Sequence, residues 1–364
     1  MKFFNTLLLL LMFVGLPLWA QDTAAVQSEK ESEDNTLREE AIAANHALFE
    51  AEDVLELTLT TDLKAVKKDI GEEREYHPAT ISYLNEEGKT VNVELKVKTR
   101  GNSRRSKDMC NFPPLRLNFN DEQSKGTIFE GQNKVKLVAH CQDNDDNYKE
   151  YVLREYFVYK AFQALTDKSF RVRLLKMTYV DSEDKNEKME KYGFIIEGDD
   201  FLAARMEGKM LEDKKIHAEN TDKPIADRVA IFQFMIGNLD WSVQENHNMK
   251  ICYNIGGLPY CIPYDFDLTG IVDAEYALPP EMLPVNTVRD RLYRGFCRTP
   301  EEFEVAFEEF RAAKDAIYAI YNESELLSEK YVNNTIKYLD DFYEIINNPK
   351  LVKQHFLKKC RRAE

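Results

Sequence analysis

The stretch Asn238–Asp267, NLDWSVQENHNMKICYNIGGLPYCIPYDFD, decides how the rest of the chain is interpreted. Two apolar runs flank Gly256 and Gly257, and a glycine pair supplies the positive φ angles that a two-residue hairpin turn needs. With these glycines as the turn, Asn248 opposes Asp265 at the open end of the hairpin. The pattern therefore predicts a β-hairpin whose mouth holds an amide beside a carboxylate.

The hairpin mouth has the chemistry of a metal site. Amide and carboxylate oxygens are hard ligands, which magnesium and manganese prefer. Asp240 lies upstream in the loop that enters the hairpin, where a carboxylate could orient a hydroxyl group for phosphoryl transfer. The plainer alternative is a surface hairpin with acidic ends, in which Asn248 only caps a turn.

The N-terminal segment is typical of an exported protein. Residues 1–20 combine Lys2, an apolar run and Ala20 before a polar segment, as in a secretory signal peptide. Residues 21–50 are mostly polar and charged, which predicts a disordered tether. The formal net charge of −15 excludes a general affinity for nucleic acid. We therefore expect a secreted, periplasmic or cell-envelope protein without a stable membrane span.

Six cysteines in an exported chain permit disulfide bonds. The predicted hairpin register places Cys252 opposite Cys261, at a spacing that suits a disulfide. Cys110 and Cys141 are a second possible pair. A zinc site is not expected because the cysteines and histidines lack zinc-ligand spacing.

Hydrophobic periodicity divides the chain into a β-rich part, residues 51–198, and a mostly helical part, residues 199–364, with the hairpin inserted. The expected strands are residues 53–60, 78–84, 90–99, 115–119, 134–139, 171–180 and 192–198. The expected helices are residues 147–164, 201–206, 224–236, 300–321, 325–346 and 349–361. The sequence thus predicts an α+β protein.

Five segments resemble motifs of the CotH (spore-coat protein H) kinase-like family. They are KTRGNSRR at 98–105, YVLREYFVYKAF at 151–162, YGFIIEG at 192–198, IGNLDW at 236–241 and IPYDFDLTG at 262–270. The resemblance implies a bilobal protein-kinase-like fold, with a β-rich N-terminal lobe and a mostly helical C-terminal lobe. It also implies ATP and magnesium, or manganese, as cofactors.

The resemblance assigns roles residue by residue. Asp240 is expected to be the catalytic base, and Asp265 a metal ligand assisted by Asp267. Asn248 is the expected amide ligand, with Asn246 as the alternative. The remaining cofactor-binding residues are expected to be Glu155, Glu197, Arg104, Arg116 and Lys136, with Lys134 as a further candidate cation. The cation is left open because Asn-Phe-Pro-Pro stands at 111–114, where the family pattern has two lysines.

Two further features lie near the expected site. His247 is interpreted as a structural residue rather than a catalytic one. Arg291, Arg294 and Arg298 would line one face if this segment were a helix. They would then pair with Glu301 and Glu302 or contact an anionic substrate.

These observations favour an ATP- and magnesium-dependent phosphotransferase that acts on a protein, glycan or other hydroxyl acceptor. The alternative is a catalytically inactive envelope protein that uses the same cleft for a protein or glycan partner. A metal-dependent hydrolase of phosphate esters is a third, weaker interpretation.

Overall fold

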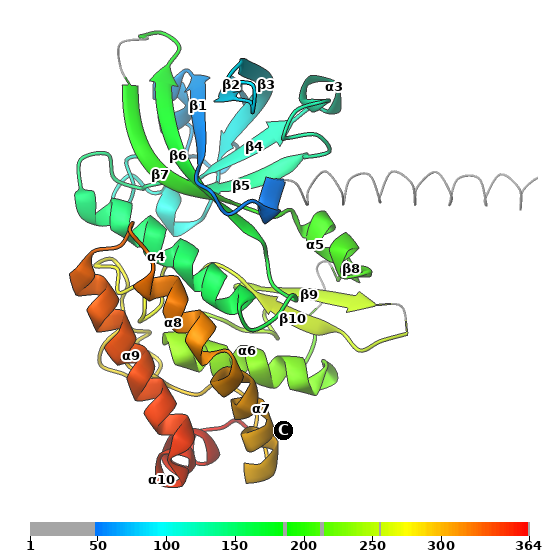
Figure 1. Cartoon of the computed structure of the whole chain (residues 1–364), viewed down its shortest axis with the longest axis vertical. Coiled ribbons are helices and arrows are strands. Elements are labelled where there is room, and N and C mark those ends of the chain that lie inside the picture. Colours follow the sequence, from blue (N-terminus) through cyan, green and yellow to red (C-terminus); the bar gives the residue numbers. More distant parts are fainter. Residues whose placement is uncertain (1–47, 185–187, 212–214, 255, 363–364) are drawn as a thin grey trace, which may run out of the picture.

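The computed structural model describes residues 48–184, 188–211, 215–254 and 256–362 (Figure 1). The predicted signal peptide and residues 21–47 of the predicted tether lie outside this part of the chain. At the end of the tether segment, Leu48 and Phe49 are buried against the core of the β-rich part. Within the described residues, no helix is both long and apolar enough to cross a membrane.

Seven strands close into a barrel in the order β1-β2-β3-β4-β5-β7-β6. They are β1 (Leu55–Thr61), β2 (His77–Leu84), β3 (Thr90–Thr99), β4 (Leu115–Phe119), β5 (Lys134–Val138), β6 (Val172–Asp181) and β7 (Lys188–Ile196). Most neighbouring strands are antiparallel, but β1 pairs with β6 in parallel, from Leu55 opposite Leu175 to Thr61 opposite Asp181. This parallel pairing closes the barrel.

Alternation of apolar and polar residues positions the strands. In β1, Leu57 and Leu59 are buried while their sequence neighbours are partly or largely exposed, which is the period-two pattern of a strand with one face in a core. The barrel interior contains Leu57, Leu59, Ile81, Val93, Leu95, Val97, Leu115, Leu117, Leu137, Leu175, Met177 and Ile195. Polar side chains of the same strands therefore face outward.

The bilobal protein-kinase-like fold expected from the sequence is wrong. The strands of the first half form a closed mixed barrel, with helices in the C-terminal part of the chain. The observed strands lie close to the predicted segments. The closure of these strands into a barrel, however, could not be predicted from the segments. Strand patterns show which side chains face inward and do not show which edges meet, because backbone hydrogen bonds carry no sequence signal.

The rest of the chain forms a second core below the barrel (Figure 1). Its helices are α4 (Asp146–Gln163), α5 (Asp199–Arg205), α6 (Lys223–Ile236), α7 (Pro300–Ala312), α8 (Lys314–Asn322), α9 (Glu329–Asn347) and α10 (Pro349–Val352). A three-stranded sheet of β8 (Gly208–Met210), β9 (Met249–Asn254) and β10 (Tyr260–Pro263) lies beside them, in the order β10-β9-β8. The helix α4 lies between the barrel and these elements.

Local signals explain the ends of two helices. α6 begins at a side-chain cap by Asp222, has Pro224 in its first turn, and ends at Gly237 with φ of 66°. α7 opens with a capping box in which Thr299 and Glu302 bond reciprocally. The helix expected to continue to Tyr321 instead breaks at Ala313 into α7 and α8.

The hairpin register differs by one residue from the prediction. Cys252 lies opposite Tyr260, and Cys261 opposite Ile251. Only Gly256 of the glycine pair has a positive φ, at 80°, so the expected two-residue turn does not form. A slip of one residue changes every cross-strand partner.

The predicted Cys252–Cys261 disulfide is therefore wrong, and both thiols are buried and reduced. The Cys110–Cys141 pair forms, and a further disulfide joins Cys297 to Cys360. Such bonds are typical of proteins in oxidising compartments.

Candidate functional site

The mouth of the hairpin brings the backbones of Asn248 and Asp265 close together. The amide of Tyr264 donates to the carbonyl of Asn248 at 3.1 Å, so Asn248 opposes the residue before Asp265. Both Asn248 and Asp265 have left-handed backbone, with φ of 52° and 64°, as does Asn246. Residues other than glycine rarely adopt this conformation, and such strain gathers at functional sites.

Asp240 lies at the centre of a small hydrogen-bond network. Its Oδ2 accepts from Asn248 Nδ2 at 3.0 Å, and its backbone carbonyl accepts from the same amide at 2.8 Å. His247 Nε2 lies 2.7 Å from Asp240 Oδ1. The loop before it is fixed because Asn238 accepts from the amide of Asp240 and from the Trp241 indole. A partly exposed carboxylate is thus held in one orientation.

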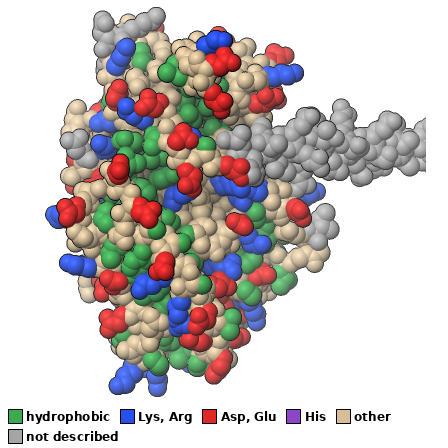
Figure 2. Space-filling model, viewed as in Figure 1, with side chains coloured by type: hydrophobic (Ala, Val, Ile, Leu, Met, Phe, Trp, Pro, Cys, Tyr) green, Lys and Arg blue, Asp and Glu red, His purple; other side chains and the backbone are tan. Residues whose placement is uncertain are grey.

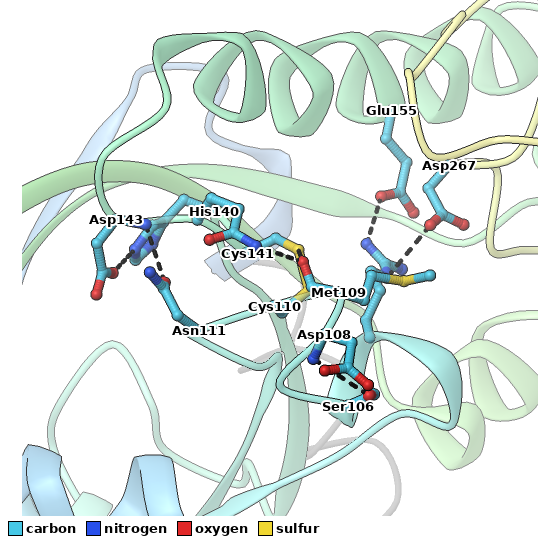
Figure 3. The surroundings of a disulfide bond; sticks show 12 residues. Ser106, Asp108, Met109, Cys110, Asn111, His140, Cys141, Asp143, Glu155 and Asp267 are labelled. Carbon is cyan, nitrogen blue, oxygen red and sulfur yellow. Dashed lines mark hydrogen bonds and ion pairs between the residues drawn. A yellow bond between two sulfur atoms is a disulfide. The ribbon is translucent and has the colours of Figure 1, made fainter.

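A buried arginine gathers three carboxyl groups, which we call the acidic cluster: Glu155, Asp265 and Asp267. Arg104 lies 3.2 Å from Glu155, 2.9 Å from Asp265 and 3.3 Å from Asp267. These residues come from the loop before β4, from α4 and from the segment after β10. Figure 3 shows Glu155 and Asp267 pointing toward the same guanidinium group.

One positive charge cannot balance three negative ones in a buried site. Burial raises the pKa of Glu155 to about 8, with Asp267 and Asp265 adding to the rise while Arg104 opposes it. Burial also raises the pKa of Asp267 to about 6, although Arg104 and a hydrogen bond from Tyr276 oppose the shift. Glu155 and Asp267 consequently retain protons at pH values where isolated carboxylic acids would lose them.

Four cations lie beside the acidic cluster, and we call them the basic face: Arg100, Arg116, Lys136 and Lys250. Arg116 and Lys136 are paired in register on β4 and β5, with side chains outside the barrel. Arg100 is within electrostatic range of Asp265, Arg116 and Lys136. This arrangement places positive charge beside the carboxylates of the hairpin mouth.

Asp199 joins two of these cations. Lys136 and Lys250 each lie 2.8 Å from one of its carboxylate oxygens. Burial raises the pKa of Asp199, but the two lysines outweigh it and hold the pKa below its usual range. Lys136 also lies 5.4 Å from the ring centre of Phe170 and 5.3 Å from that of Tyr264. The basic face therefore has aromatic rings next to it.

Glu197 is fully occupied by structural contacts. Its carboxylate accepts from Arg205 at 2.9 Å and 3.1 Å and from the amide of Arg171 at 3.1 Å. It lies at the end of β7, where the chain passes to α5. Its visible role is to fix this connection.

The basic run after residue 288 is not a helix and does not pair with Glu301 or Glu302. Arg298 instead forms ion pairs with Asp227 and Glu219, both at 2.9 Å. Arg294 donates to the carbonyl of Leu239, next to Asp240. This segment therefore contacts the loop of Asp240 through Arg294.

Most of the predicted site residues come together at this place. Asp240 contacts Asn248, and Arg104 contacts Glu155, Asp265 and Asp267, while Arg116 and Lys136 line the adjacent face. Sequence reasoning missed four contributors: Arg100, Asp199, Lys250 and Tyr276. It also treated His247 as structural, although His247 contacts the candidate base. For two of these residues, the position in the sequence could have suggested a role. Arg100 begins the RGNSRR loop, and Asp199 follows Gly198 at the start of a helix.

The residue types fit a hard divalent cation, since Asn248, Asp265 and Asp267 supply oxygen ligands. In the described part of the chain, however, no three His, Cys, Asp or Glu side chains form a ready metal-binding group. Arg104 holds Asp265 and Asp267 instead. A cation at this place would have to share or replace those contacts.

Comparison with protein-family models and with curated proteins finds no match to this sequence. The functional argument therefore depends on the site itself.

Proposed function

We propose that this protein is a metal-dependent phosphotransferase that moves a phosphoryl group from ATP to a hydroxyl acceptor on a protein or glycan. The observation that carries the proposal is the arrangement at the hairpin mouth. An oriented carboxylate, Asp240, contacts an amide ligand, Asn248, beside Asp265 and a set of cations. Phosphoryl transfer needs these three elements: a base, a metal-binding group and positive charge for the phosphates.

Each residue has a role in this proposal. Asp240 accepts the proton of the acceptor hydroxyl, while His247 and Asn248 hold its carboxylate in place. Asn248, Asp265 and Asp267 would hold magnesium or manganese, which neutralises phosphate charge when bound. Arg116 and Lys136 contact the phosphate oxygens, with Arg100 beside them. Glu155 positions Arg104 near the metal ligands.

The proposed compartment follows from two independent features. The first twenty residues have the pattern of a secretory signal, and the two disulfides fit an oxidising environment. We infer a secreted, periplasmic or envelope protein. The motifs at 236–241 and 262–270, which resemble the CotH family, coincide with the hairpin mouth and support the phosphotransferase proposal.

The direct test is incubation of the purified protein with γ-labelled ATP and magnesium, alone and with a cell-envelope extract. The proposal predicts label in the protein or in an acceptor, and loss of label in Asp240→Asn. Release of free phosphate without a labelled acceptor would instead indicate a hydrolase. Absence of both labelled acceptor and free phosphate would contradict the proposal.

The second candidate function is non-catalytic binding of a protein or glycan at the same site. One observation favours it: Arg104 already satisfies Asp265 and Asp267, and a buried ion pair resists replacement. An Asp240→Asn variant that keeps partner binding, in a protein that never transfers phosphate, is the result expected for this function.

A further inference from the structure

A pocket lined by six lysines lies at the barrel. It encloses about 720 Å³, a volume typical of small-molecule sites. The lysines come from α2 (Leu63–Lys68), from the loop before β4 and from β7; they are Lys64, Lys67, Lys68, Lys107, Lys188 and Lys191. We call this the lysine pocket.

The lysine pocket is strongly positive within an acidic protein. Its lining contains six lysines against two carboxylates, Asp143 and Asp181, whereas the whole chain has a net charge of −15. Asp143 is already engaged by Lys67 at 2.7 Å and by His140 at 2.8 Å. Among the described residues, the exposed side chains of Lys68 and Lys188 form no ion pair, so their charge is available to a ligand.

Two buried aromatic rings pack at the wall of the lysine pocket. The rings of Phe112 and Tyr179 lie 4.5 Å apart between centres, and Lys67 Nζ lies 5.7 Å from the Phe112 ring centre. Both rings are buried. The rings pack in the core behind the charged amines, and the amines at the surface of the pocket suit a compact ligand that carries several anionic substituents.

The same wall contains polar atoms that lack partners. Among the described residues, Tyr179 Oη and Asp181 Oδ2 are buried without a hydrogen bond. Burial raises the pKa of Tyr179 well above its usual range, so its hydroxyl remains a hydrogen-bond donor. Unsatisfied polar atoms in a buried wall are costly. A polar ligand in the pocket would give such atoms hydrogen-bond partners.

The lysine pocket is separate from the candidate active site. Figure 3 shows His140 and Asp143 on one side of the Cys110–Cys141 disulfide, and Glu155 and Asp267 on the other. The disulfide fixes the loop that carries Arg104 and Lys107 between the two places. The lysine pocket thus needs a function of its own.

We propose that the lysine pocket binds a compact sugar-sized ring that carries several phosphate or sulfate esters. Lysine amines act as flexible point charges, which suits several ester groups more than one planar carboxylate. A long polyanion is disfavoured because the remaining surface is acidic and would repel it. The proposal is independent of the phosphotransferase function.

The test is calorimetric titration of the full chain with inositol hexakisphosphate and, separately, sucrose octasulfate. Saturable binding of the first alone assigns phosphate esters, binding of the second alone assigns sulfate esters, and binding of both assigns the shared anionic chemistry. Affinity should fall between about 0.1 M and about 1 M salt, because the screening length shrinks from about 10 Å to about 3 Å.

Matched variants locate the binding. The exposed pair Lys68→Glu and Lys188→Glu should weaken affinity by roughly tenfold or more. The control pair Lys330→Glu and Lys350→Glu makes the same charge change on α9 and α10, and should have a much smaller effect. Asp265→Ala should leave this affinity unchanged, which separates the lysine pocket from the active site.

Three outcomes would overturn the proposal. They are absence of saturable binding by either probe, equal weakening in the pocket and control variants, and equally tight binding of inorganic sulfate at matched ionic strength.

Discussion

Single residues with left-handed backbone mark the candidate site. Asn248 and Asp265 keep such conformations although each costs free energy. Asparagine and aspartate adopt left-handed backbone more readily than most other residues with side chains. A functional side chain can therefore occupy a position whose backbone conformation usually favours glycine. Left-handed backbone also occurs at Glu207, outside the site, so the functional argument depends on the side-chain contacts of Asn248 and Asp265 as well.

This strain leads to a prediction for Asn248→Gly. Glycine relieves the backbone cost but removes the amide that contacts Asp240, so stability should stay equal or rise by up to about 1 kcal/mol while phosphoryl transfer is lost. Denaturant midpoints and the labelled-ATP assay measure the two effects. Glu207→Gly, at a left-handed residue outside the site with φ of 52°, is the control and should retain transfer. An active Asn248→Gly protein would refute the ligand role.

His140 should make stability depend on pH. It is fully buried, and burial lowers its pKa below the usual 6.5 despite the opposing hydrogen bond to Asp143. The unfolded chain therefore binds a proton more readily, and stability should fall as the pH drops below about 6.5, by at most about 1.4 kcal/mol per pH unit. Urea unfolding between pH 7 and pH 5 should show a shallower slope for His140→Asn; parallel slopes would contradict this assignment.

At the residue scale, sequence reasoning found the charged groups that belong to local motifs. Asp240, Asn248 and Asp265 lie within one short stretch, so their spacing was informative. Arg100 and Asp199 are far apart in the chain and meet the site only through folding. No local pattern marks residues whose partners are distant.

At the scale of elements, the junction between α6 and the loop of Asp240 depends on Gly237. Its φ is 66°, and a Cβ atom there would lie 2.2 Å from the hydroxyl of Tyr338. The residue thus needs both a left-handed backbone and the absence of a side chain. This close approach also fixes the direction in which Asn238 and Asp240 leave the helix.

Gly237→Ala should destabilise the protein by about 2 to 4 kcal/mol, because backbone strain and a steric clash add together. Gly88→Ala is the matched control, since Gly88 has φ of 73° but open space around its Cβ position. That variant should lose only about 1 kcal/mol. Thermal or urea unfolding of both proteins gives the difference, and equal losses would show that the contact with Tyr338 is unimportant.

In the hairpin, the turn pattern predicted the reversal of the chain but not the strand register. The glycine pair correctly predicted a reversal between β9 and β10, yet the register is displaced by one residue. A glycine pair permits several turn lengths, so it does not by itself fix the register. The incorrect disulfide followed directly from that displacement.

At the scale of the whole molecule, the main feature is closure of the barrel. The charged surface does not indicate it, since acidic and basic side chains are mixed across the visible face (Figure 2). The strand positions were predictable from alternation, and so were most helices from their apolar faces and caps. The parallel contact of β1 with β6 joins segments more than a hundred residues apart, and such long-range pairing leaves no local pattern.

Barrel closure predicts slow hydrogen exchange along both β1 and β6. If the two strands pair, the amides of the half of β1 that lies between β2 and β6, Thr58 to Thr61, should be protected to a degree similar to those in the centre of β3. Mass spectrometry of peptides that cover residues 55–61 and 172–181 measures this. Fast exchange confined to one edge of these strands would indicate an open sheet.

The most direct test of the whole account is nucleotide-dependent stabilisation of Asp265→Ala. ATP with magnesium at about 100 times its dissociation constant should stabilise the wild-type protein by about 2.7 kcal/mol, and chelation of the metal should abolish the effect. The variant should show no such stabilisation, whereas the control Asp341→Ala, an exposed carboxylate on α9, should match the wild type. Equal stabilisation of Asp265→Ala and wild type would contradict the proposed site.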